Sequence, residues 1–145
     1  MQWAETIAQK IIQKNPNKEE YVCAAGISPS GSIHIGNFRD IATSYFVAKS
    51  LRKMGKKAKL LFSWDEFDRM RKVPVNVAKV RDDMEKYIGC PYVDVPNPFP
   101  NSTAANYAEY FENEFEESLE KFGIKMEFRH QAQMYRSGKY KDYVL

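Results

Sequence analysis

The sequence predicts an α/β protein built on a parallel sheet. Two short apolar runs, residues 21–25 and 58–64, flank a long amphipathic run from residue 38 to residue 54. Continuous apolar runs of this length are typical of buried parallel strands, and the run between them has helical periodicity. Strand, helix and strand in this order make a βαβ unit, which is right-handed almost without exception. A ligand is then expected beyond the carboxyl ends of the strands.

Length and composition indicate one ordinary globular domain. The chain has 145 residues, of which 43% are hydrophobic and 28% charged, with a net charge of +3. This small charge neither requires nor excludes RNA as a partner. No apolar run approaches the ~20 residues that span a bilayer, and no secretory signal is recognised, so we expect no membrane association and a cytoplasmic protein. Cys23 and Cys90 form no C-x-x-C, so we predict reduced, buried thiols and no metal site.

The first predicted element is an N-terminal helix over residues 3–12. Trp3, Ile7 and Ile11 recur at helical spacing on one face, with Ala4, Ala8 and Ile12 beside them. The Asn-Pro-Asn sequence at 15–17 should end it. We expect this helix to cover the sheet.

Two further helices are predicted from periodicity and a closing glycine. The first runs over residues 37–54, with Gly55 as a left-handed cap, and the second over residues 76–88, ending at Gly89. Between them lies the apolar run that supplies the second strand.

The last third of the chain alternates between irregular and regular segments. Prolines keep residues 90–101 extended or turning, and residues 101–103 offer an N-cap for a helix over 104–122. Residues 124–128 alternate like a strand, and a final segment covers 135–145. The apolar face of the helix is predicted to contain Tyr107, Tyr110, Phe111, Phe115, Leu119 and Phe122. Six acids occupy its other faces, so we expect a surface helix.

The loop at residues 26–37 joins the first strand to the long helix and is predicted to bind phosphate. Glycines let the backbone approach a ligand closely, and the N–H groups at a helix start can face an anion. Because Gly26, Gly31 and Gly36 are spaced five residues apart, the dinucleotide fingerprint is excluded. A P-loop is excluded as well, since no Lys follows Gly31.

A second polar stretch, residues 65–74, follows the second strand and should lie at the same edge of the sheet. It carries acidic and basic side chains close together, among them Asp65 and Asp68. A solvated turn is the alternative. Its place opposite the loop at residues 26–37 favours a functional role.

The sequence Pro-Ser-Gly-Ser-Ile-His-Ile-Gly-Asn at 29–37 resembles the HIGH motif of class I aminoacyl-tRNA synthetases, with Asn in place of the second His. Other matching segments narrow the resemblance to class I lysyl-tRNA synthetase, the archaeal-type enzyme also found in some bacteria. They are Trp3-Ala4, Ser63-Trp-Asp-Glu-Phe-Asp-Arg69, Arg71-Lys-Val-Pro74, Val95-Pro-Asn-Pro-Phe99, Tyr107-Ala-Glu109 and Tyr135-Arg-Ser-Gly-Lys-Tyr140. The resemblance covers essentially residues 1–145 and implies one Rossmann-like unit, the N-terminal part of the catalytic domain.

The resemblance implies activation of lysine with ATP, as the Mg²⁺ complex, followed by transfer to tRNA(Lys). His34 and Asn37 would be the catalytic residues and would bind the ATP phosphates. Gly36 would pack near the adenosine, and Pro29 and Ser30 would also contact ATP.

The lysine substrate is expected at the start of the same loop. By resemblance, the turn containing Gly26 and Ser28 would line the lysine pocket. Because lysine carries two positive charges, Asp65 and Asp68 are predicted to contact its cationic groups or the adenosine. The resemblance leaves open which carboxylate meets which amine.

The sequence departs from the family pattern in two respects. Family members often carry Gly-Cys-His after the Pro-x-Pro-Phe segment, where this chain has Pro100-Asn-Ser102. They are also several times longer, with a KMSKS loop and an anticodon-binding domain. The sequence at 53–57 looks like KMSKS, but basic residues followed by Gly are the ordinary end of a helix, at the amino-terminal side of the strands.

We therefore expect a piece of the enzyme that is incompetent alone and needs a C-terminal portion or a complementary polypeptide. Two alternatives stay open at this point. One is a small nucleotidyltransferase with a related H-x-G-H loop, and the other is a non-catalytic synthetase paralogue that only binds or regulates.

Overall fold

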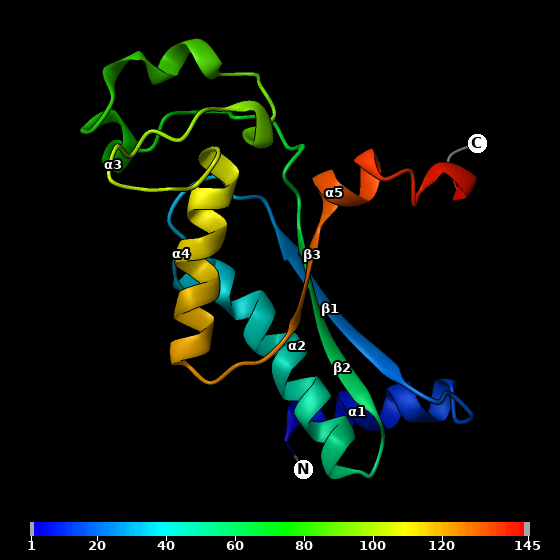
Figure 1. The fold of residues 1–145 in the computed structure, drawn as a ribbon. Coiled ribbons are helices and arrows are strands. Elements are labelled where there is room, and N and C mark those ends of the chain that lie inside the picture. The colour runs from blue at the N-terminus through cyan, green and yellow to red at the C-terminus, as the bar shows by residue number, and fades with distance from the viewer. Residues whose placement is uncertain (1, 144–145) are drawn as a thin grey trace.

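The computed structural model describes residues 2–143, which form a three-stranded parallel sheet with helices packed against it (Figure 1). The strands are β1 (Tyr21–Ile27), β2 (Ala58–Trp64) and β3 (Glu127–His130), in the order β1-β2-β3. The α-helices are α1 (Trp3–Lys14), α2 (Ile35–Lys53), α3 (Val75–Ala78), α4 (Tyr107–Lys121) and α5 (Gln131–Arg136). Short 3-10 helices cover Asp82–Tyr87, Tyr92–Asp94 and Lys141–Tyr143. The α/β class and the βαβ unit are confirmed.

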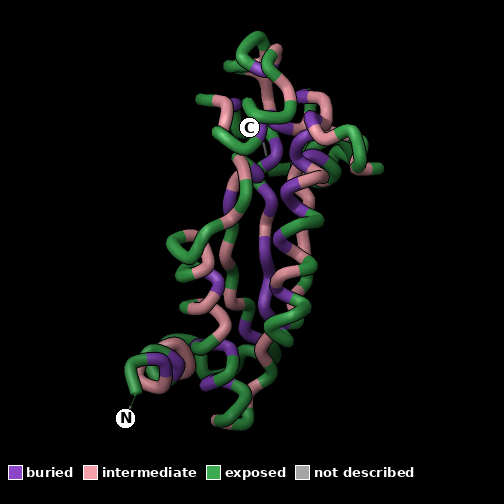
Figure 2. Tube along the Cα trace, turned by 90° about the vertical axis from the view of Figure 1, so that its left-hand side faces the viewer, coloured by how far each residue is buried: buried purple, intermediate pink, exposed green. Residues whose placement is uncertain are grey.

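Helices α2 and α4 pack on one face of the sheet and build the main core. Parallel pairing sets Ala25 beside Phe62 and Phe62 beside Phe128, so these side chains share that face. Phe62 and Trp64 are fully buried, and both meet Phe115 of α4 at ring-centroid distances of 5.8 Å. Figure 2 shows the buried residues along the line where strands and helices face each other.

Strand β1 is less buried than the sequence predicts. Its residues alternate between the helix-covered face and an open one, on which Val22, Ala24 and Gly26 are exposed. The apolar run predicts a strand covered on both faces, and this part of the prediction is wrong. The small side chains of this strand make residues 21–25 uniformly apolar in sequence, but they do not build a second core on the open face of the sheet.

Helix α1 packs through its small residues. Ala4 and Ala8 are buried against α2 and the start of β1, whereas Trp3 and Ile7 are exposed, and Ile11 is half-buried. The buried side is therefore the one that carries the two alanines, because their small side chains allow the helix to approach α2 closely. Trp3 instead lies over the edge of the Phe46 ring at a centroid distance of 6.5 Å.

The segment predicted as one helix over residues 76–88 is two short helices. Helix α3 ends at Ala78, and a 3-10 turn begins at Asp82. Asp83 accepts hydrogen bonds from Arg81 Nε at 2.6 Å and from Lys86 Nζ at 2.5 Å, which fold the chain locally. These segments, the loop before α4 and α4 itself enclose a second core around Met70, Val77, Met84, Tyr92 and Phe111.

Three predicted boundaries in the last third of the chain are wrong. Helix α4 is capped by Asn106, whose Oδ1 accepts the N–H of Glu109 at 2.9 Å, and not by residues 101–103. Strand β3 starts at Glu127 instead of residue 124, because Ile124 is buried in the main core before the strand begins. The last predicted segment begins earlier, as α5, and its residues 144–145 lie outside the described part of the chain.

Candidate functional site

Two loops meet where β1 and β2 end. The backbone N–H of Asp65 donates to the carbonyl of Ile27 at 3.0 Å, and Ser28 Oγ donates to the Asp68 carboxylate. Gly26 pairs with Ser63 so closely that a Cβ on Gly26 would lie 2.9 Å from the Ser63 carbonyl oxygen. The predicted meeting of the two loops is therefore confirmed, and it joins Ser28 to Asp68 directly.

His34 begins helix α2 and folds back over its first turn. Its Nδ1 accepts a hydrogen bond from the N–H of Gly36 at 3.1 Å, and the side chain is exposed. A Cβ on Gly36 would lie 2.9 Å from His34 Cε1, so a glycine is needed for this position of the ring. Because Nδ1 accepts, the proton of the neutral imidazole lies on Nε2, which can donate to a ligand. Asn37 lies half-buried in the next position of the helix.

Helix α4 anchors the middle of the loop at residues 26–37. Pro29 is fully buried, and the carbonyl of Ser30 accepts a hydrogen bond from the Tyr107 hydroxyl at 2.9 Å. Burial raises the pKa of Tyr107 well above its usual range, so the hydroxyl stays protonated and keeps donating. Sequence analysis placed Tyr107 in the core and missed this anchoring role.

Asp65 and Asp68 lie at a small pocket of about 170 Å³ shared with Phe67, Gln131 and Tyr135. Partial burial raises the pKa of Asp65, and the charges of Asp68 and Glu66 raise it further. Such mutual repulsion is relieved by a cation between the carboxylates. Among the residues that the structure describes, no hydrogen bond or ion pair joins His34 to either carboxylate.

The whole chain, residues 1–145, matches the protein family described as tRNA synthetases class I (K). The chain belongs to this family. The two loops that meet at the strand ends contain several of the segments on which the resemblance rested.

Curated relatives of this synthetase chain carry the name lysine–tRNA ligase. The protein from Pyrococcus horikoshii is 41% identical over 142 residues, which are 98% of this chain and 26% of the relative. Those from Thermococcus kodakarensis and Treponema pallidum are 42% and 39% identical, over 95% and 97% of this chain and 25% and 26% of theirs. The chain thus spans about a quarter of the length of these relatives.

The structure places the KMSKS-like sequence of this synthetase chain away from the two loops. Lys53 ends α2, Gly55 has a φ of 76°, and β2 starts at Ala58. The sequence lies at the amino-terminal end of the strands, and the interpretation as an ordinary helix end is confirmed. Within residues 2–143, no helix combines the length and apolar character that crossing a membrane requires.

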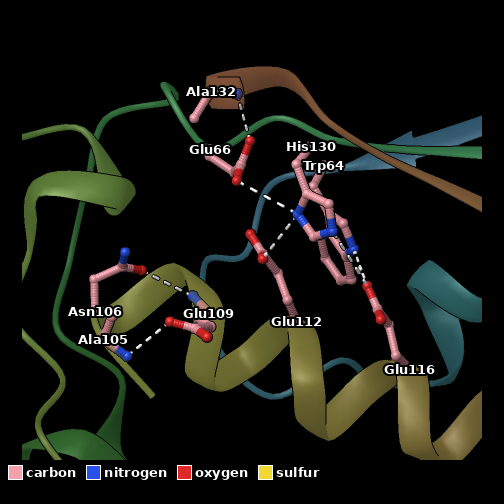
Figure 3. A network of polar contacts seen from close by, with 9 residues as sticks. All are labelled: Trp64, Glu66, Ala105, Asn106, Glu109, Glu112, Glu116, His130 and Ala132. Atoms are coloured by element: carbon pink, nitrogen blue, oxygen red, sulfur yellow. Dashed lines mark hydrogen bonds and ion pairs between the residues drawn. The ribbon is translucent and has the colours of Figure 1, made fainter. Parts of the chain in front are cut away.

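Sequence analysis also missed a cluster next to the site, formed by Glu66, Glu112 and His130 (Figure 3). His130 Nδ1 lies 3.2 Å from Glu112 Oε2 and 3.5 Å from Glu66 Oε1. These contacts, with Glu112 first and Glu66 second, raise the pKa of His130 to about 10. Burial raises the pKa of Glu112. The helical wheel assigned Glu112 to a solvated face, yet the residue is only 3% exposed.

Proposed function

We propose that this chain forms the part of a lysyl-tRNA synthetase active site that binds ATP and lysine. The observation that carries the proposal is the junction of the two loops at the strand ends, where Ser28 hydrogen-bonds to Asp68. It is supported by family membership and by relatives named lysine–tRNA ligase. Such an enzyme works in the cytoplasm, where we expect this chain.

ATP is proposed to bind at the start of α2. His34 Nε2–H and the Asn37 amide would donate to phosphate oxygens, and the first N–H groups of this 19-residue helix add a favourable dipole. Gly36 leaves the imidazole in place and gives the adenosine room. Pro29 and Ser30 form the fixed floor of the loop, because one is buried and the other is held by Tyr107.

Lysine is proposed to bind between Gly26, Ser28, Asp65 and Asp68. The two carboxylates match the two ammonium groups of lysine. Burial, and then repulsion by Asp68, raises the pKa of Asp65, and a bound ammonium group would offset both. The lysine carboxylate then attacks the α-phosphate of ATP, forming a carboxylate–phosphate bond as pyrophosphate leaves. No residue of the chain becomes covalently modified, so its contribution is positioning and charge stabilisation.

The second step transfers lysine to the terminal adenosine of tRNA(Lys) and releases AMP. Mg²⁺ would accompany ATP as its counter-ion. Family enzymes bring further lysines to the departing pyrophosphate from a KMSKS loop, which the helix end at 53–57 does not supply. We therefore expect this chain to bind substrates and to need further synthetase segments for catalysis.

Lysine-dependent ATP–pyrophosphate exchange tests the proposal, measured with the 145-residue chain alone and mixed with the remaining portion of a related enzyme. Exchange only in the mixture, lost in Asp68→Asn, is the expected result. As a matched control, Asp94→Asn changes an exposed aspartate paired with Arg136 and should leave exchange intact. Exchange that requires a phosphoester acceptor in place of lysine would indicate a nucleotidyltransferase, and ATP binding without exchange would indicate a non-catalytic paralogue.

A further inference from the structure

We propose that Glu66, Glu112 and His130 form a binding site for a divalent transition-metal ion of the Zn²⁺ class. The three residues come from three elements: Glu66 follows β2, Glu112 lies in α4, and His130 ends β3. Their side chains point toward one another in Figure 3. The site is separate from the residues proposed to bind ATP and lysine.

The distances suit a small ion. One ligand atom from each residue can be chosen so that all three lie within 4.8 Å of one another. A tetrahedron with metal–ligand bonds of about 2.0–2.1 Å has edges of about 3.4 Å. The distances from His130 Nδ1 to the glutamate oxygens are 3.2 Å and 3.5 Å. The two edges between His130 and the glutamates therefore already match a tetrahedral site.

Glu112 supplies the second, independent observation. Its side chain is 4% exposed, and in the described part of the chain its Oε1 is buried without a hydrogen-bond partner. This oxygen points toward the Glu66 carboxylate in Figure 3. A buried carboxylate oxygen without a partner is costly, and beside a second buried carboxylate the cost rises. The His130 imidazolium meets Glu112 only at Oε2, and a metal ion that replaces its Nδ1 proton would engage the unpartnered oxygen as well.

An ion can reach the cluster from outside. The three residues line an open pocket of about 660 Å³, together with Glu109, Glu116 and others. The pocket gives room for water in the remaining coordination position. This combination of three protein ligands and an open position is common in Zn²⁺ sites.

The surroundings already orient two of the ligands. Glu66 Oε2 accepts the N–H of Ala132 at 2.5 Å, which leaves Oε1 facing His130. Glu116 accepts the indole N–H of Trp64 at 2.8 Å and lies 4.0 Å from His130 Nε2. Carboxylates beside the outer nitrogen of a ligand histidine fix the ring and raise its basicity. An imidazole in the donor set favours Zn²⁺ over Mg²⁺.

Calorimetric titration of the 145-residue chain with Zn²⁺ tests the proposal. We expect one Zn²⁺ per chain, and roughly a hundredfold weaker binding in His130→Gln and in Glu112→Gln. The chain has two histidines, so His34→Gln is the matched control and should keep wild-type affinity. Circular dichroism establishes that each variant is folded.

X-ray absorption at the zinc edge gives a readout that needs no variant. We expect nitrogen and oxygen ligands at about 2.0–2.1 Å and no sulfur at about 2.3 Å, which separates this cluster from Cys23 and Cys90. Absence of stoichiometric binding, sulfur ligation, or loss of binding in His34→Gln would each overturn the proposal. So would unchanged binding in folded His130→Gln, and His130 would then be an ion-pair partner of the two glutamates only.

Discussion

Gly36→Ala should separate the function of the α2 start from its stability. The new Cβ would lie 2.9 Å from Cε1 and 3.0 Å from Nδ1 of His34. Both are atoms of an exposed side chain, so the ring can rotate away without moving the backbone. The imidazole supplies the atoms nearest to the new Cβ, and the helical backbone at residue 36 is a conformation that alanine adopts readily.

The expected free-energy changes nearly cancel. Alanine in place of glycine favours a helix by up to about 1 kcal/mol. Loss of the cap that His34 Nδ1 provides costs about 1 kcal/mol. The free energy of unfolding should therefore change by less than about 1 kcal/mol.

The affinity for ATP should fall much more. A hydrogen bond to a charged group contributes about 1.5–3 kcal/mol. Displacing the imidazole should then weaken ATP binding roughly 10- to 100-fold, since each 1.4 kcal/mol is a factor of ten. Urea denaturation and calorimetric titration with ATP measure the two quantities on the same variant.

Thr43→Ala is the matched control, because it also raises helix propensity in α2 but touches the Arg39 carbonyl instead of His34. It should leave ATP affinity unchanged. Wild-type ATP affinity in Gly36→Ala would refute the role of the imidazole position. A loss of more than about 2 kcal/mol in stability would show that the ring cannot rotate away.

Two further predictions concern the anchor of the loop at Ser30 and the ion pairs of Asp83. Tyr107→Phe removes a buried hydroxyl that holds the Ser30 carbonyl, so urea denaturation should show a loss of about 1 kcal/mol, and equal stability would argue against this anchor. The hydrogen bonds from Arg81 and then Lys86 lower the pKa of Asp83 from 3.8 to about 2. Because the folded-state pKa is the lower one, this stabilisation is full above pH 3.8 and disappears as the pH falls toward about 2. In Asp83→Asn, the free energy of unfolding should fall less steeply as the pH decreases through that window. An unchanged slope would contradict the ion-pair interpretation.

Local sequence patterns predicted the βαβ unit well because its information is local. Strands β1 and β2 follow from two apolar runs, and α2 follows from its periodicity and a glycine cap. The loops at residues 26–37 and 65–74 are then placed by the ends of the strands. The cap of α4 was misplaced because residues 101–103 and Asn106 all offer suitable side chains, and packing of Tyr107 decided between them. N-cap propensity alone does not distinguish among these residues.

The cluster of Glu66, Glu112 and His130 could not be predicted in this way. It depends on the register that pairs Trp64 with His130 and on the rotation of α4 that buries Glu112. Both are set by tertiary packing. A glutamate in a Glu-rich helix carries no local mark of burial.

Strand β1 lies at an edge of the sheet, which has a consequence for how further synthetase segments could join the proposed site. In the three-stranded sheet, β1 pairs with β2 on one side, and Gly26 lies near its end, just before Ser28. Any parallel strand that paired with the other side of β1 would bring its own carboxyl end next to these residues. Pairing of the two backbones would therefore also place new side chains beside the site. An edge strand of this kind also pairs readily with wrong partners, so the concentration of free chain would govern whether completion or aggregation prevails.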